Sequence, residues 1–220
     1  MKKLLSILLT AIALTTPVIA AEPPKLVIAN PNAVVDSISP EMIRDLVTEL
    51  GGKNAQISDA EKNKVVNFED ANLPYTFGIT GCDIRPGKCM TLVMLVFLKT
   101  DPGAVTVDMV NKHNEDGFFD TAIKLDNNIV AFARGVVVDG GVARMNLAMN
   151  IVIYAALVHD GMKRLNSQLV ASNNLPGSYA RVAQHRSSIQ PVRASRQQVD
   201  KALAVLGNQH RQGAWSRLGH

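Results

Sequence analysis

The residues of this 220-residue chain that are best suited to chemistry are its only two cysteines, Cys82 and Cys89, in the stretch GCDIRPGKC. Thiols at this spacing could ligate a metal, perform redox chemistry or form a disulfide. A structural zinc site needs about four Cys or His ligands, and no histidine lies near this pair in the sequence. Redox motifs place about two residues between the thiols, at the start of a helix. Here the spacing is wider and the flanks look like strands, so the compartment decides the question.

The first twenty residues indicate export. The basic start MKK precedes an apolar run that is too short to cross a bilayer core of about 30 Å as a helix. Val18 and Ala20 supply the small residues of a cleavage site. We therefore expect a signal peptide over residues 1–20, a mature chain that begins at Ala21, and a periplasmic or secreted protein.

In an oxidising compartment a cysteine pair forms a disulfide by default. A tight turn at Pro86-Gly87 would place Cys82 opposite Thr91, so pairing with Cys89 implies a wider loop or a diagonal bridge. Closing so short a loop should stabilise the fold by roughly 2–3 kcal/mol. The prediction is a structural disulfide between Cys82 and Cys89 that joins the two strands of a hairpin.

Other catalytic or metal-binding patterns are absent from the sequence. It contains no G-x-S-x-G, H-E-x-x-H, P-loop or G-x-G-x-x-G motif. His159-Asp160 has no partner histidine at i+4, and the remaining histidines of the C-terminal region lack a rigid scaffold. We expect no enzymatic activity, no cofactor and no metal. A hydrolase without a recognisable motif is the alternative.

Three helices and five strands are expected in a domain over residues 22–170. A helix follows the N-cap Ser39 and ends at Gly51-Gly52. Strands are expected at about 64–69, 74–82 and 89–99, a short helix at 107–117, two strands joined by a turn at 126–128, and a helix from about Val142 to Leu169. The order α-β-β-β-α-β-β-α predicts an α+β fold, with an antiparallel sheet of about five strands packed by helices.

The last fifty residues differ in composition. Residues 21–170 carry 14 basic and 18 acidic residues, whereas residues 171–220 carry seven basic residues and one acidic residue. Few apolar residues interrupt this region, so we expect a basic, largely disordered tail. Within it, Ser195 could cap a short amphipathic helix with Val199, Leu203 and Leu206 on one side.

Residues 110–154 resemble the YbjN family of bacterial proteins. The matching residues are Asn111, Asn114, Phe119, Ala122, Leu125, Asp126, Gly140, Gly141, Val142, Asn146 and Leu147. The resemblance extends over roughly residues 38–170, although His113 stands where the family usually has tryptophan and Gly135 where an acid is common. It implies a fold similar to type III secretion chaperones, often dimeric, with a cysteine pair between two central strands. Members are labelled sensory-transduction regulators, and no enzymatic activity is implied.

The family motif gives a candidate binding surface formed by Asn111, Asn114, Gly140 and Gly141. Each residue also has a structural explanation. The glycines permit backbone angles that other residues resist, or their amides could bind an anion before the helix. The asparagines could satisfy the free carbonyls of a helix end.

Three functions remain open. The leading hypothesis is a non-catalytic periplasmic protein, chaperone-like or regulatory, that binds another envelope protein. The second is weak binding of a polyanion or an anionic membrane surface through the basic tail, and the third is the hydrolase. Nucleic acid is not expected as a partner. A homodimer is expected because the last helix carries a second apolar row, which consists of Met145, Val152 and Leu157.

Overall fold

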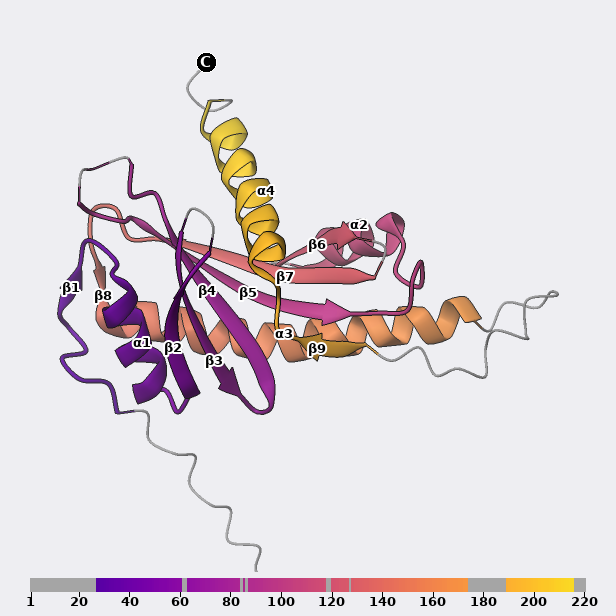
Figure 1. Cartoon of the computed structure of the whole chain (residues 1–220), viewed down its shortest axis with the longest axis horizontal. Coiled ribbons are helices and arrows are strands. Elements are labelled where there is room, and N and C mark those ends of the chain that lie inside the picture. Colours follow the sequence, from indigo (N-terminus) through magenta and orange to yellow (C-terminus); the bar gives the residue numbers. More distant parts are fainter. Residues whose placement is uncertain are drawn as a thin grey trace, which may run out of the picture.

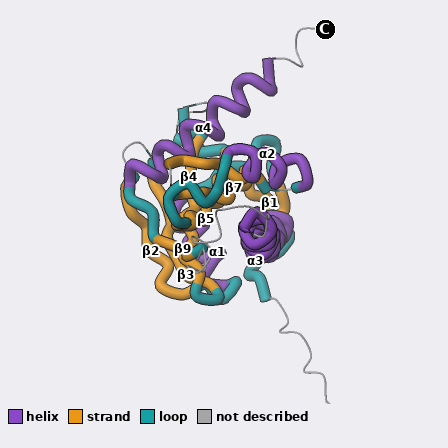
Figure 2. Tube along the Cα trace, turned by 90° about the vertical axis from the view of Figure 1, so that its right-hand side faces the viewer, coloured by secondary structure: helices purple, strands orange, loops and turns teal. Residues whose placement is uncertain are grey.

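An antiparallel sheet with helices on both faces forms the molecule (Figures 1 and 2). The structure, a computed structural model, describes residues 27–60, 63–83, 85, 87–117, 120–126, 128–173 and 189–215, without the side chains of 170–173 and 207–215. The predicted signal peptide, residues 1–20, lies outside the described residues.

The nine strands of the described residues form one short pair and one large sheet. The strands are β1 (Val34–Val35), β2 (Lys53–Asp59), β3 (Lys64–Asp70), β4 (Leu73–Thr80), β5 (Thr91–Lys99), β6 (Thr121–Asp126), β7 (Ile129–Val137), β8 (Val142–Ala143) and β9 (Gln190–Val192). The helices are α1 (Pro40–Glu49), α2 (Val107–Asp116), α3 (Arg144–Asn173) and α4 (Arg196–Trp215).

The large sheet has seven strands, of which six follow the order β2-β3-β4-β5-β7-β6, while β9 pairs with β5. Every pairing is antiparallel. The predicted α+β fold with an antiparallel sheet is therefore confirmed. The expected order lacked β2 and the short strands β1, β8 and β9. The sequence of β2, KNAQISD, is too polar to be recognised as a strand.

The two faces of the sheet bury separate apolar clusters. On the first face, α1 and α3 cover side chains of β3, β4, β5 and β7. On the second face, α4 covers a smaller cluster of the same sheet, as the two views show (Figures 1 and 2). Central strand β5 contributes to both clusters, because successive side chains of a strand point to opposite faces.

Local signals explain the first helix and the start of the long one. Ser39 caps α1, since its hydroxyl accepts a hydrogen bond from the Met42 amide at 3.2 Å. Gly51, with φ +92°, ends the helix in the left-handed conformation that glycine favours. The first amides of α3, from Arg144 and Met145, donate to the carbonyls of Ala33 and Pro31.

The expectation of a disordered tail is wrong for part of residues 171–220. Strand β9 and helix α4 are ordered, and Val199, Leu203 and Leu206 are buried against the sheet. The physical reason is that the second face of the sheet supplies apolar surface that the tail's own composition lacks. Residues 174–188 and 216–220 lie outside the described residues.

Candidate binding groove

An apolar groove opens between α1, the β3–β4 hairpin and the middle of α3. It has a volume of about 250 Å³. Its lining consists of Val47, Leu50, Gly52, Phe68, Asp70, Tyr75, Phe77, Ile151, Val152 and Ala155. We call this cavity the α1–α3 groove. Apart from Asp70 and the Tyr75 hydroxyl, its side chains are hydrocarbon.

One wall of the groove is built by three aromatic rings of the β3–β4 hairpin. Ala71 and Asn72 form its turn, both with positive φ, which is the conformation that two-residue hairpin loops require. This turn fixes Phe68 opposite Tyr75, and their rings stack with centroids 5.1 Å apart. Phe77 lies two residues beyond Tyr75 on the same face and meets the Phe68 ring edge-on at 4.8 Å.

Gly52 lets the end of α1 approach this wall. A Cβ at this position would lie 2.8 Å from both the Phe68 ring and the Val47 carbonyl oxygen. A side chain larger than hydrogen would therefore push α1 away from the hairpin and reshape the groove.

Tyr75 lines the groove, and its hydroxyl is enclosed by the protein. Tyr75 is 2% exposed, and none of the described residues gives its hydroxyl a hydrogen-bond partner. Burial, and then the carboxylate of Asp70, raise the pKa of Tyr75 well above its ordinary value, so the group stays a neutral donor. By contrast, the hydroxyl of buried Tyr154 donates to the Phe132 carbonyl at 2.8 Å. Most buried hydroxyls have a hydrogen-bond partner, so the two buried tyrosines differ in this respect.

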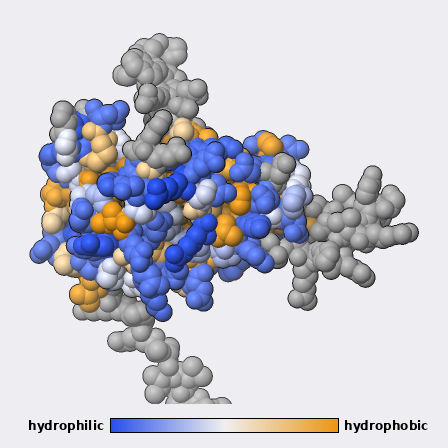
Figure 3. Space-filling view, in the orientation of Figure 1, coloured by the Kyte–Doolittle hydropathy of each residue, from blue (hydrophilic) through white to orange (hydrophobic). Residues whose placement is uncertain are grey.

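Exposed apolar side chains continue the groove along α3. Met149, Val152 and Ile153 are each about 40% exposed, and Val152 also lines the groove. We call these three residues the α3 row. Elsewhere, on the face seen in Figure 1, apolar side chains form small patches separated by hydrophilic ones (Figure 3). The other members of the row expected from the sequence, Met145 and Leu157, are half-buried.

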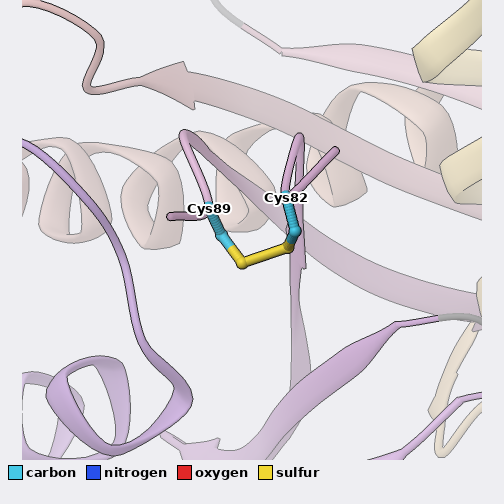
Figure 4. The surroundings of a disulfide bond; sticks show 2 residues. All are labelled: Cys82 and Cys89. Atoms are coloured by element: carbon cyan, nitrogen blue, oxygen red, sulfur yellow. A yellow bond between two sulfur atoms is a disulfide. The ribbon is translucent and has the colours of Figure 1, made fainter. Parts of the chain in front are cut away.

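A disulfide joins Cys82 and Cys89 in the loop between β4 and β5 (Figure 4). Thr80 pairs with Thr91, so the two cysteines face each other in the same register across a wider loop. The Cys89 carbonyl accepts a hydrogen bond from the Ile38 amide at 2.8 Å, which ties the entry to α1 to this loop. The bridge thus lies away from the groove and has a structural task.

The structure does not bring the four candidate binding residues into one surface. Asn114 on α2 is used structurally, since its amide exchanges two hydrogen bonds with the backbone of Ala122 at 2.7 and 3.0 Å. Asn111 is exposed on the same helix. Gly140 and Gly141 form a turn with positive φ at the other end of α3 (Figure 1). These residues are placed as folding elements, separate from the groove.

A buried His–Asp hydrogen-bonded pair lies where α2 meets α3, and sequence reasoning missed it. The Nε2 atom of His113 lies 3.0 Å from the Asp120 carboxylate, with side chains 1% and 0% exposed. Gly161 makes room for the imidazole, because a Cβ there would lie 3.1 Å from its Cε1 atom. Arg164 lies 3.9 Å from the same carboxylate. The closed surroundings suit this pair to fixing α2 on α3, and His113 could have been recognised as buried from its spacing to Val110.

Two further searches give negative results for the part of the chain that the structure describes. No group of three or more His, Cys, Asp or Glu side chains is placed to hold a metal ion there. No helix within the same residues is long and apolar enough to cross a bilayer. His159 is exposed on α3, and Asp160 pairs with Arg164 one turn further along.

Comparison with known proteins gives one structural likeness. No family model matches the sequence, and no curated protein matches it. The structure is similar to the crystal structure of YbjN, described as "a putative transcription regulator from E. coli", with 14% sequence identity and a TM-score of 0.43. The match covers 62% of this chain and 95% of that chain. A TM-score below about 0.5 does not establish a shared fold, so membership of the YbjN family stays a prediction from the sequence.

Proposed function

We propose that this chain is an exported, non-catalytic member of the YbjN family that binds another envelope protein, in a chaperone-like or regulatory role. The observation that carries the proposal is the α1–α3 groove, an apolar cavity of about 250 Å³ beside the exposed α3 row. A contiguous exposed apolar surface next to a cavity is typical of protein-interaction sites. Export rests on residues 1–20 and on the cysteine pair.

The groove defines what a partner must offer. An apolar helix or strand would lie along Met149, Val152 and Ile153 and insert one side chain between the Phe68 and Tyr75 rings and α3. Asp70, half-buried at the rim, favours a basic or amide group beside the inserted side chain. The expected partner segment is therefore amphipathic, with a positive charge next to its apolar anchor.

A second copy of this chain is the competing occupant, because apolar rows on two α3 helices could cover each other. That arrangement would give the homodimer that the sequence predicts. The two cases differ in which protein occupies the groove, so one set of variants can separate them.

The alternative function, polyanion or membrane-surface binding through the basic tail, has less support. Arg193 pairs with Glu69 and Lys201 pairs with Asp126, so two of the tail's cations already contact acids of the body. Cations that are paired within the molecule contribute less to an external anion site.

The test uses full-length mature protein as bait in an envelope extract, followed by affinity measurement with the captured protein. Val152→Glu should abolish capture, because it places a charge in the apolar surface that the partner must bury. Val107→Glu is the matched control, because Val107 is 58% exposed on α2 and lies outside the groove. Equal capture by wild type and Val152→Glu would overturn the proposal. Light scattering that shows a dimer dissociated by Val152→Glu would assign the groove to a second copy.

A further inference from the structure

Strand β5 has a gap along one of its edges. On one side, β7 pairs with β5 over its full length, from Thr91 to Lys99. On the other side, β4 follows β5 only as far as the Thr76–Leu95 pair. The remaining residues of β4, from Leu73 to Tyr75, pair with β3 alone. The end of β5 would therefore expose unpaired backbone groups at the centre of the sheet.

The C-terminal segment fills this gap by strand addition. Gln190, Pro191 and Val192 of β9 pair antiparallel with Lys99, Leu98 and Phe97. Pro191 lacks an amide hydrogen, which suits a short strand with only one partner. Adding an extended peptide to a free sheet edge is a common mode of peptide recognition.

Helix α4 follows β9 after a short connection, and a capping box marks its start. The Ser195 hydroxyl accepts from the Gln198 amide at 3.3 Å, and the Gln198 side chain accepts from the Ser195 amide at 2.9 Å. This reciprocal capping box satisfies two amides without help from the body. The residues that start the helix after the strand therefore belong to the segment itself.

The second face of the sheet has a matching socket for α4. Val199, Ala202, Leu203 and Leu206 are 7% exposed or less. Leu203 lies directly over Gly78 of β4, where a Cβ would come within 2.8 Å of the leucine Cδ2 atom. A side chain at this position of β4 would occupy the space that Leu203 fills.

Polar contacts on both sides of the socket fix the register of the segment. The guanidinium of Arg193 pairs with Glu69 at the end of β3. The ammonium of Lys201 donates to the Leu125 carbonyl and lies 3.2 Å from the Asp126 carboxylate at the end of β6. These contacts, like the apolar ones, join the segment to strands of the sheet.

We infer that the β5 gap and the apolar second face form a peptide-binding site whose ligand is a strand followed by a Ser-capped amphipathic helix. We further infer that residues 189–215 of a second copy bind it in place of the chain's own segment, so that two copies exchange these segments. The strand pairing, the Leu203 packing and the two polar contacts described above join the segment to the sheet, and a segment of the same chain or of a second copy could make them equally. Residues 174–188 provide the covalent link, and reciprocal exchange would keep every contact. This site is separate from the α1–α3 groove, so a negative result at one site leaves the proposal for the other unchanged.

The first experiment cuts the link in full-length protein through a specific protease site inserted within residues 174–188. The C-terminal fragment should co-elute with the body after cleavage. A fluorescent peptide of residues 189–215 should then replace it, as measured by anisotropy. The Leu203→Asp peptide should bind at least about tenfold more weakly, whereas the Ala204→Asp peptide should bind like wild type, because Ala204 is the exposed neighbour. Release of the fragment, aggregation after cleavage, or equal binding of both variant peptides would overturn the inferred site.

The second experiment tests the exchange in uncut protein. Two full-length samples with different fluorophores are mixed at high concentration, incubated, diluted and examined for energy transfer. A mixed dimer that is abolished by Leu203→Asp and retained by Ala204→Asp is the expected result. A monomer at all concentrations, or a mixed dimer that Leu203→Asp leaves intact, would overturn the exchange of segments.

Discussion

The two faces of the sheet are closed in different ways. The first face is covered by α1 and α3 and holds the large aromatic side chains Phe68, Tyr75, Phe77, Phe132 and Tyr154. The second face is built from aliphatic residues, alanines and one aromatic ring, Phe97, and is covered by four side chains of α4.

We call the first face the foundation, because it supplies most of the stability of the domain, and the segment that closes the second face the cover. Aromatic side chains bury more apolar area than alanine or valine, so the first face contributes more to the free energy of unfolding. The second face is completed by a segment with its own caps and a late position in the chain. We therefore expect damage to the first face to unfold the whole domain and damage to the second face to release the segment.

The largest effect is expected for Phe77→Ala on the first face. Phe77 is fully buried and contacts the rings of Phe68, Tyr75 and Tyr154. Loss of its ring should lower the free energy of unfolding by about 3–5 kcal/mol. Chemical denaturation followed by circular dichroism measures this change. A loss below about 1 kcal/mol, comparable to that of a surface substitution, would contradict the assignment of the first face as foundation.

A smaller and more local effect is expected for Leu206→Ala on the second face. Leu206 is 7% exposed and is the last residue of α4 whose side chain the structure describes. The substitution should weaken docking by about 2 kcal/mol, at the low end for leucine because the site is at the rim. Hydrogen exchange should accelerate in β9 and α4 while α1 and α3 keep their protection. Faster exchange in all four elements would show that the two faces unfold as one unit.

The smallest effect concerns the acid sensitivity of the cover. The hydrogen bond from Arg193, followed by that from Asn54, lowers the pKa of Glu69 below its ordinary value of 4.5. A lowered pKa in the folded state means that the contribution of Glu69 is complete above pH 4.5 and is lost as the pH falls through the folded value. Exchange protection of β9 should therefore decrease as the pH falls below 4.5. Glu69→Gln should remove this pH dependence, and an unchanged profile in that variant would exclude the contact as its source.

The sequence predicted the first face well because its signals are local. Ser39, Gly51 and the apolar spacing of α1 specify a capped amphipathic helix without reference to the rest of the chain. The nearly continuous apolar run of β5 predicted a central strand, and it is one. Strand β2 was missed because an edge strand with polar residues has no such pattern.

The second face was missed although two signals for it were present. The spacing of Val199, Leu203 and Leu206 after Ser195 described a helix, but tail composition predicted disorder. The other signal was β5 itself: Val93, Leu95 and Phe97 alternate with residues that face α1 and α3, so both faces of this strand needed cover.

The α1–α3 groove has no comparable signal in the sequence. Its shape depends on how closely α1 approaches the hairpin at Gly52, which is a tertiary contact. The unpartnered hydroxyl of Tyr75 cannot be distinguished by sequence from the satisfied hydroxyl of Tyr154. The family motif pointed instead to Asn111, Asn114, Gly140 and Gly141, whose matched positions reflect turns and helix ends.

The edges of the sheet bear on how the protein behaves when concentrated. The outermost strands are β2 and β6, and each has a register irregularity, between Lys53 and Gln56 in β2 and between Lys124 and Asp126 in β6. Bulges and charged side chains at an edge hinder the addition of a neighbouring molecule's strand. Both outer edges are thus poor templates for fibril growth, which suits a protein whose central strand depends on a late segment for its last hydrogen bonds.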